Sequence, residues 1–257
     1  MQRFFTLTLP DGFAADAVLA HRFDALPELL SGLGLGKGPV LVVVGGAGGM
    51  SVDDGRRLQP LFVEVLAPLA QSLDAIVLDG GTDAGVMKWM GEARADIGGT
   101  FPLVGVAAVG TVVLPDRANV SAHAALPACG HTHFVFVPGD RWGEESPWMA
   151  HIAGLLSAGF GSVTVVINGG ETTWWDAFYS IRGRRPTLIF AGSGRTADQL
   201  AAALNGEACD SRAAALAASG LLEVIGVGWE RAVIDDRIRR LLTDRRLHAA
   251  QGFVTGR

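Results

Sequence analysis

One stretch of the chain decides its fold: Val163-Thr-Val-Val-Ile-Asn-Gly-Gly-Glu-Thr-Thr-Trp-Trp-Asp176. Its apolar residues predict a buried strand, its glycine pair a tight turn, and the residues that follow the first turn of a helix. Turns that follow the strands of a parallel sheet all lie at its carboxyl edge, where ligands bind. The same order recurs at Val40–Val44 with Gly45-Gly46, at Ala75–Leu78 with Gly80-Gly81, and at Thr187–Phe190 with Gly192-Ser193-Gly194.

The rest of the chain continues this alternation. Further strands are predicted at Phe4–Leu9, Leu103–Val109 and His131–Val137 and around Leu222. Helices are predicted at Ala14–Leu30, from the N-cap Ser51 to about Gln71, around Val86–Ala93, and at Pro147–Leu156, Thr173–Ile181, Thr196–Leu204 and Trp229–Leu242. This order predicts an α/β fold, in which a doubly wound, mainly parallel sheet has helices on both faces.

The sequence has no linker and no compositional break, so we expect one domain over residues 1–257. It divides into an N-terminal extension (1–38), a core that carries the motifs (39–204), and a C-terminal strand and helix that complete the fold (205–257). A long irregular loop is predicted at Leu114–Cys129, and loops of that length in compact domains usually have a function.

Composition narrows the class of protein. Hydrophobic residues make up 49% of the chain and charged residues 18%, which predicts a large buried sheet. The net charge of −5 argues against nucleic acid as the main partner. The only cysteines, Cys129 and Cys209, favour a reducing compartment. The longest apolar run, Leu103–Leu114, is too short to span a bilayer, and Met1–Pro10 is too short and polar for a signal peptide. We therefore expect a cytoplasmic protein without membrane contact.

The glycine turns suit an anionic ligand such as a nucleotide phosphate, because they present backbone N–H groups and positive helix ends. Arg195 follows the last turn, where a guanidinium can hold a phosphate by two hydrogen bonds; an ordinary surface arginine is the alternative. A capped helix start without a ligand is the alternative for each turn. The candidate ligand-binding residues are Gly45, Gly46, Gly48, Gly49, Gly80, Gly81, Thr82, Gly169, Gly170, Glu171, Thr172, Thr173, Gly192, Ser193, Gly194 and Arg195.

Two histidines and several tryptophans add further candidates. His131 and His133 stand two apart on a predicted strand, so both imidazoles can face one ligand; solvated or core histidines are the alternative. With Cys129 the two histidines form the pattern Cys-x-His-x-His, which could ligate a metal ion. No second His/Cys pair stands nearby, and we expect no metal. The indoles beside the predicted edge turns can stack on a base or pack in the core: Trp142, Trp148, Trp174 and Trp175.

These motifs resemble the SLOG superfamily, and within it the LSDAT group, the prokaryotic relatives of the N-terminal domain of TRPM cation channels. The resemblance covers about Val40 to Leu204. It is carried by His131-Thr-His-Phe134, by the Gly169-Gly170 turn, and by the turn Gly192-Ser-Gly-Arg195 followed by Asp198. It implies a Rossmann-like sheet and a nucleotide-derived ligand, such as ADP-ribose, an NAD-derived metabolite or a nucleoside monophosphate.

The same superfamily includes the LOG phosphoribohydrolases, whose signature is Pro-Gly-Gly-x-Gly-Thr-x-x-Glu. The segment Asn168–Asp176 is similar to it in the glycine pair and in its second threonine. Asp176 stands where that family has a glutamate implicated in N-glycosidic cleavage, and its side chain is one methylene shorter. The resemblance makes Asp176 and Glu171 the candidate catalytic residues, with His131 or His133 as acid or base.

Three functions follow as hypotheses. The first is a nucleotide-binding sensor or regulatory domain that requires no other cofactor. The second is a hydrolase of N-glycosidic or phosphoanhydride bonds in nucleotides. The third is a homo-oligomeric adaptor with a vestigial pocket.

Overall fold

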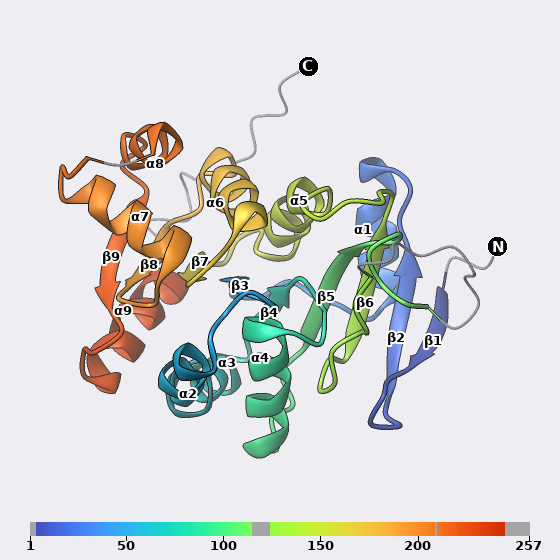
Figure 1. Cartoon of the computed structure of the whole chain (residues 1–257). Helices are drawn as coiled ribbons and strands as arrows, with labels where there is room; N and C mark the ends of the chain where they lie inside the picture. The colour runs from blue at the N-terminus through green and yellow to red at the C-terminus, as the bar shows by residue number, and fades with distance from the viewer. Residues whose placement is uncertain (1–3, 115–123, 209, 245–257) are drawn as a thin grey trace.

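The computed structural model describes residues 4–114, 124–208 and 210–244. Its described strands form one sheet in the order β1-β2-β6-β5-β4-β3-β7-β8-β9, in which only the β1–β2 pair is antiparallel (Figure 1). The strands are β1 (Phe4–Thr8), β2 (Ala14–Leu19), β3 (Val40–Gly45), β4 (Ile76–Asp79), β5 (Leu103–Ala108), β6 (His133–Val137), β7 (Ser162–Ile167), β8 (Thr187–Ala191) and β9 (Leu222–Gly226).

Helices cover both faces of this sheet, and each layer encloses its own apolar core (Figure 1). One face carries α1 (Leu26–Gly32), α5 (Ser146–Leu156), α6 (Glu171–Arg182), α7 (Arg195–Leu204) and α8 (Ser211–Ala217). The other carries α2 (Val52–Leu61), η2 (Phe62–Leu66), α3 (Ala67–Leu73), α4 (Gly85–Asp96) and α9 (Arg231–Thr243). The predicted doubly wound, mainly parallel α/β sheet is confirmed.

The segment from Ser51 onward shows how local sequence shapes one helical layer. Ser51 caps α2 as predicted, because its hydroxyl oxygen accepts a hydrogen bond from the Asp54 amide at 3.0 Å. Pro60 lies inside α2, and the π-helical turn η2 follows it before Pro68 opens α3. Proline has no backbone N–H, and a π-helical turn lets the helix continue although one of its backbone hydrogen bonds is missing. Helical structure therefore continues to Leu73, two residues beyond the predicted end.

The predicted helix Ala14–Leu30 is wrong over its first part, whereas Leu26–Leu30 lies within α1 as predicted. Ala14–Leu19 forms β2, which pairs with β1 on one side and with β6 on the other. A short turn, η1 (Phe23–Ala25), then leads into α1. The edge of β6 offers this alanine-rich segment a ladder of hydrogen bonds, and such tertiary context overrides helix propensity. The N-terminal extension therefore completes the sheet.

The strand order reverses at β3, which positions the site. Successive strands β4 and β5 add on one side of β3, whereas β7 and β8 add on the other. Such a switch point leaves a crevice at the carboxyl ends of the strands. Of the predicted loop Leu114–Cys129, residues 115–123 lie outside the described part, and isolated bridges join Ala125 to Val112 and Pro127 to Thr82. None of the described helices is long and apolar enough to cross a bilayer.

Candidate functional site

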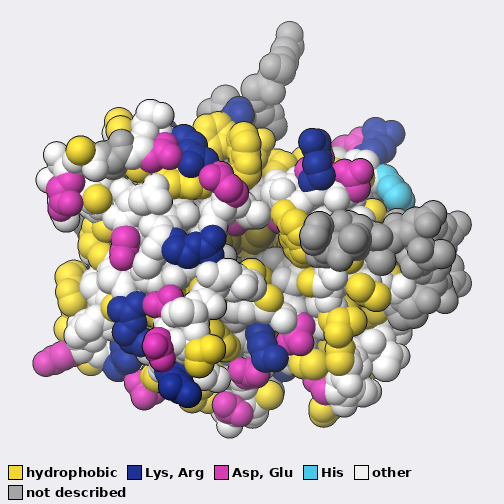
Figure 2. Space-filling model, in the orientation of Figure 1, with side chains coloured by type: hydrophobic (Ala, Val, Ile, Leu, Met, Phe, Trp, Pro, Cys, Tyr) yellow, Lys and Arg dark blue, Asp and Glu magenta, His cyan; other side chains and the backbone are white. Residues whose placement is uncertain are grey.

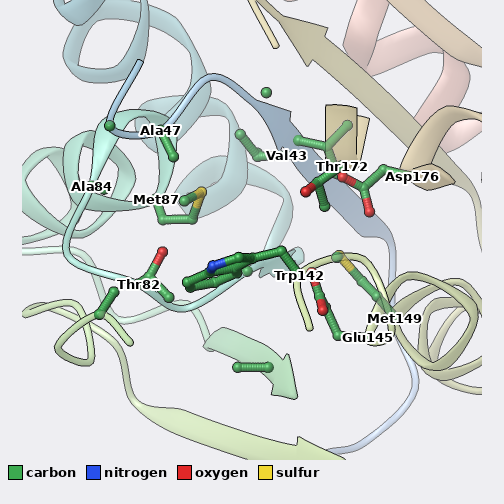
Figure 3. Close-up of a pocket in the computed structure, with 16 residues that line it drawn as sticks. Val43, Ala47, Thr82, Ala84, Met87, Trp142, Glu145, Met149, Thr172 and Asp176 are labelled. Atoms are coloured by element: carbon green, nitrogen blue, oxygen red, sulfur yellow. The ribbon is translucent and has the colours of Figure 1, made fainter. Parts of the chain in front are cut away.

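A cavity of about 380 Å³ lies at the carboxyl ends of β3, β4 and β5, between α4, α5 and α6 (Figure 3). Its volume is in the range of small-molecule sites. It is lined by Val43, Val44, Gly45, Ala47, Gly48, Gly80, Thr82, Ala84, Met87, Ala107, Ala125, Trp142, Glu145, Met149, Thr172 and Asp176. Glycines of two predicted turns line it, and the helix that follows a third turn contributes Thr172 and Asp176.

Hydrogen bonds join the turns that follow β7 and β8. Asn168 is fully buried with a φ of 61°, and its amide Nδ2 donates to the carbonyl oxygen of Ser193 at 2.7 Å. The Ser193 hydroxyl accepts from the Asn168 backbone amide, also at 2.7 Å. Thr196 donates to the carbonyl oxygen of Gly170 at 3.1 Å. These bonds hold the two turns together at the edge of the sheet.

The turn after β3 meets the turn after β7. A Cβ atom on Gly45 would lie 1.9 Å from the carbonyl oxygen of Ile167, so only glycine permits this close approach. The Thr173 hydroxyl also contacts the Gly45 carbonyl, at 3.4 Å. Three turns thus form one continuous backbone surface beside the pocket.

The Arg195 guanidinium lies against this surface. A Cβ atom on Gly49 would come within 2.8 Å of its Nη1, and one on Gly170 within 3.1 Å of its Nη2. Arg195 is exposed, and no hydrogen bond or ion pair to another described residue holds its guanidinium. It therefore presents an uncompensated positive charge where three glycine turns meet.

Two carboxyl groups line the pocket, one from α6 and one from the residue before α5. Asp176 lies one turn into α6 and accepts a hydrogen bond from the Ser146 hydroxyl at 2.6 Å. Burial, and secondarily the charge of Glu145, raises the pKa of Asp176 to about 7. Glu145 is only 5% exposed, and burial raises its pKa as well. The backbone amide of Gly143 donates to both of its oxygens, at 3.1 and 3.0 Å.

The remaining wall of the pocket is apolar. Figure 3 shows the indole of Trp142 extending between Thr82 on one side and Glu145 with Met149 on the other. Trp142 is 42% exposed, so one part of its ring remains open to solvent or to a ligand. Trp148 and Trp174 are buried, and Trp175 is exposed away from the lining.

The structure brings only part of the predicted site together. Gly45, Gly48, Gly80, Thr82, Thr172 and Asp176 line the pocket. Beside it, in the turns themselves, are Gly46, Gly49, Gly81, Gly169, Gly170, Thr173, Gly192, Ser193, Gly194 and Arg195. The predicted site is thus an edge of the sheet with one cavity at its centre.

Glu171 does not fit the catalytic role predicted for it. Its carboxylate is exposed and forms an ion pair with Arg212 of α8 at 2.7 Å, which lowers its pKa. Arg212 is fixed in turn by Asp210 and by the face of Trp174. Glu171 is the first residue of α6, and its carboxylate lies on the outer surface rather than in the pocket.

The two histidines do not share a ligand face as predicted. His131 precedes β6, and its Nε2 lies 2.8 Å from Oδ1 of the buried Asp79. His133 opens β6 and turns its Nε2 to the carbonyl oxygen of Leu33 at 3.2 Å, and burial lowers its pKa. The alternation rule fails because His131 lies outside the strand. Neither residue lines the pocket, and the described residues contain no cluster that fits a metal ion.

Sequence reasoning missed Glu145. It stands in the turn before α5, far in sequence from every glycine motif, and no local pattern marks it. Its only signal is its place after Gly143 and beside Ser146, and the fold brings that turn to Asp176.

The surface charge seen in Figure 2 does not resemble a nucleic-acid interface. Lys and Arg side chains are scattered among acidic ones on the face in view, without the continuous basic surface that binds the phosphate backbone of a nucleic acid.

The fold and site together define a Rossmann-like α/β protein with a pocket at its switch point. A solved structure of the protein TM1055 has the same fold, with a TM-score of 0.51 and 19% identity over 78% of this chain and 98% of that one. The family model described as "SLOG in TRPM, prokaryote" matches residues 38–234, and the chain belongs to this family.

Animal ion channels contain a related segment. The chain is 27% identical over 197 residues to the transient receptor potential cation channel subfamily M member 2 of Mus musculus, and equally to that of Rattus norvegicus. The match covers 63% of this chain and 13% of each channel. The similarity therefore concerns one segment of the channel.

Proposed function

We propose that this chain binds a nucleotide-derived small molecule and acts as a sensor or regulatory domain. The phosphates would lie on the turns after β3, β7 and β8, and the rest of the ligand would enter the pocket. The observation that carries the proposal is the Arg195 guanidinium, which lies over Gly49 and Gly170 without a carboxylate partner among the described residues. Backbone N–H groups, helix starts and one free guanidinium together suit a phosphate.

Family membership supports this proposal at a coarser level, since it relates the chain to the TRPM segment. What we propose beyond family membership is the identity of the ligand as a nucleotide derivative, with ADP-ribose among the candidates. A cytoplasmic location and self-association stay predictions.

Isothermal titration with ADP-ribose, NAD⁺ and AMP tests the proposal. Arg195→Ala is expected to weaken binding of a phosphate ligand about 10- to 100-fold, the range for charge-assisted hydrogen bonds. Arg184→Ala is the matched control: Arg184 is also exposed and also has a φ of 53°, but it follows α6 at the opposite edge of the sheet. No binding at millimolar ligand, or equal losses in both variants, would contradict the proposal.

The environment of Asp176 favours a second candidate, hydrolysis of an N-glycosidic bond. A carboxyl group with a pKa of about 7 exchanges protons readily at neutral pH. Water would add to C1′ of the ribose as the C1′–N bond breaks, and Asp176 would accept the water proton and pass it to the departing nitrogen of the base. Chromatography for free base and ribose phosphate tests this. Asp176→Asn is expected to abolish the release, and unchanged turnover in that variant would exclude this role.

A further inference from the structure

The charges that line the pocket do not balance. Glu145 and Asp176 are acidic, and none of the other lining residues that the structure describes is Lys, Arg or His. The groups that do contact these carboxyls, the Gly143 amide and the Ser146 hydroxyl, are neutral donors. Neutral donors satisfy oxygen lone pairs but leave the charge in place, and buried charge without a partner is costly. Among the described lining residues, therefore, no positive side chain balances these two carboxyl groups.

The apolar part of the pocket suits a flat ring. Trp142 presents its indole to the cavity, and Met87 and Met149 line it with polarizable thioethers (Figure 3). An indole face attracts cations more strongly than any other side-chain ring does. Indole and carboxyl groups therefore favour the same kind of ligand group, one that is both planar and positively charged.

We infer that the pocket selects a nucleotide-derived ligand with a cationic heteroaromatic ring, such as the pyridinium of an oxidised nicotinamide dinucleotide, over the same ligand with a neutral ring. This inference rests on the proposed function, because the phosphates of the ligand would occupy the glycine turns. The ring would lie beside Trp142 and bring its positive charge to Glu145 and Asp176. Ribose hydroxyls are the competing occupants: they could donate hydrogen bonds to the carboxyls but would leave the charge uncompensated.

Three ligands with the same adenosine diphosphate part separate these possibilities in calorimetric titrations at pH 7.5. The first is the carbocyclic analogue of NAD⁺, in which carbon replaces the ribose ring oxygen so that the bond to the pyridinium resists hydrolysis. The second is its reduced form, which has a neutral ring. The third is ADP-ribose, which has no ring there. We expect the oxidised analogue to bind at least about tenfold more tightly than the reduced one.

Two conservative variants locate the effect. Asp176→Asn and Glu145→Gln keep side-chain shape and remove one charge each, so each is expected to reduce the preference for the cationic ring severalfold. Affinity for ADP-ribose reports whether the variant still folds and binds phosphates, and Trp142→Phe keeps a ring while weakening the cation contact.

The outcomes are distinct. Equal affinity for the oxidised and reduced analogues, with ADP-ribose bound, would overturn the inference, assign the carboxyls to ribose hydroxyls, and leave the proposed function intact. A preference that survives in both charge-neutral variants would also overturn it. If none of the three ligands binds, the proposed function fails, and this inference fails with it.

Discussion

Asn168 shows how one residue shapes the site. Its φ of 61° lies in the left-handed region, and its amide group bonds to Gly169 and Ser193. Asparagine tolerates this conformation better than most residues. The LOG signature has proline at the aligned position, and proline, fixed near −65°, could not adopt it. The turn in this chain therefore differs from what that signature permits, although both contain the same glycine pair.

The conformation of Asn168 predicts an unusual order of stability for substitutions there. Asn168→Ala is expected to destabilise the protein more than Asn168→Gly, by about 1 kcal/mol, because alanine loses the same hydrogen bonds and is strained at this φ. Urea unfolding of the two variants measures the difference. The reverse order would show that flexibility of the unfolded chain outweighs backbone strain.

Asp176 gives the protein a pH dependence with a definite sign. A folded-state pKa of about 7, above the usual value for Asp, means that the folded protein holds this proton more tightly than the unfolded chain. The resulting stabilisation is complete below about pH 4 and is lost as the pH rises to 7. Asp176→Asn is expected to match the parent near pH 4 and to exceed it at pH 8.

The gain at pH 8 is expected to be about 2 kcal/mol, less than the full pKa shift implies, because the carboxyl borders an open pocket. Unfolding free energies of parent and variant at pH 4, 6 and 8 measure it. A difference that does not change with pH would contradict the raised pKa.

At the scale of elements, the start of α2 makes a separable contribution. Ser51 is exposed, so its role is confined to capping the first turn through Asp54. Ser51→Ala is expected to lower the free energy of unfolding by about 1 kcal/mol. Ser31→Ala is a suitable comparison, since Ser31 is an exposed serine within α1 whose hydroxyl forms no hydrogen bond with another described residue. Equal effects of the two substitutions in thermal unfolding would refute the capping role.

Elements with a strong local signature could be predicted from sequence, and those set by distant contacts could not. The strands before the glycine turns are almost entirely apolar, and the structure places each of them inside the sheet, with a neighbouring strand on both sides. Ala14–Leu19 has a weak pattern of its own and becomes a strand only because β6 lies beside it. Asp176 was predictable from its motif, whereas Glu145 enters the pocket through the path of the chain around β6 and α5.

At the scale of the whole molecule, the β1–β2 hairpin closes one side of the sheet. Leu7, Ala17 and Leu19 pack with Phe134 and Phe136 of β6 in a separate apolar cluster. The family model begins at residue 38 and leaves this hairpin out. Removal of the β1–β2 hairpin would turn β6 into an open edge strand with apolar side chains exposed.

Deletion of residues 1–20 is therefore expected to give an aggregated protein or one with a clearly lower melting temperature. Size-exclusion chromatography with light scattering detects association, and circular dichroism separates it from unfolding. A monodisperse variant that melts with the parent would show that β6 needs no cover.

The bonds among the glycine turns also bear on how quickly a ligand could be recognised. Asn168, Ser193, Thr173 and Thr196 tie three loops to one another, so these loops are ordered when the chain folds. Binding of a small molecule there costs the protein little further backbone entropy, because these three loops are already tied together. Association at this edge should then approach the limit set by diffusion, and differences in affinity between ligands should appear in how long each one stays.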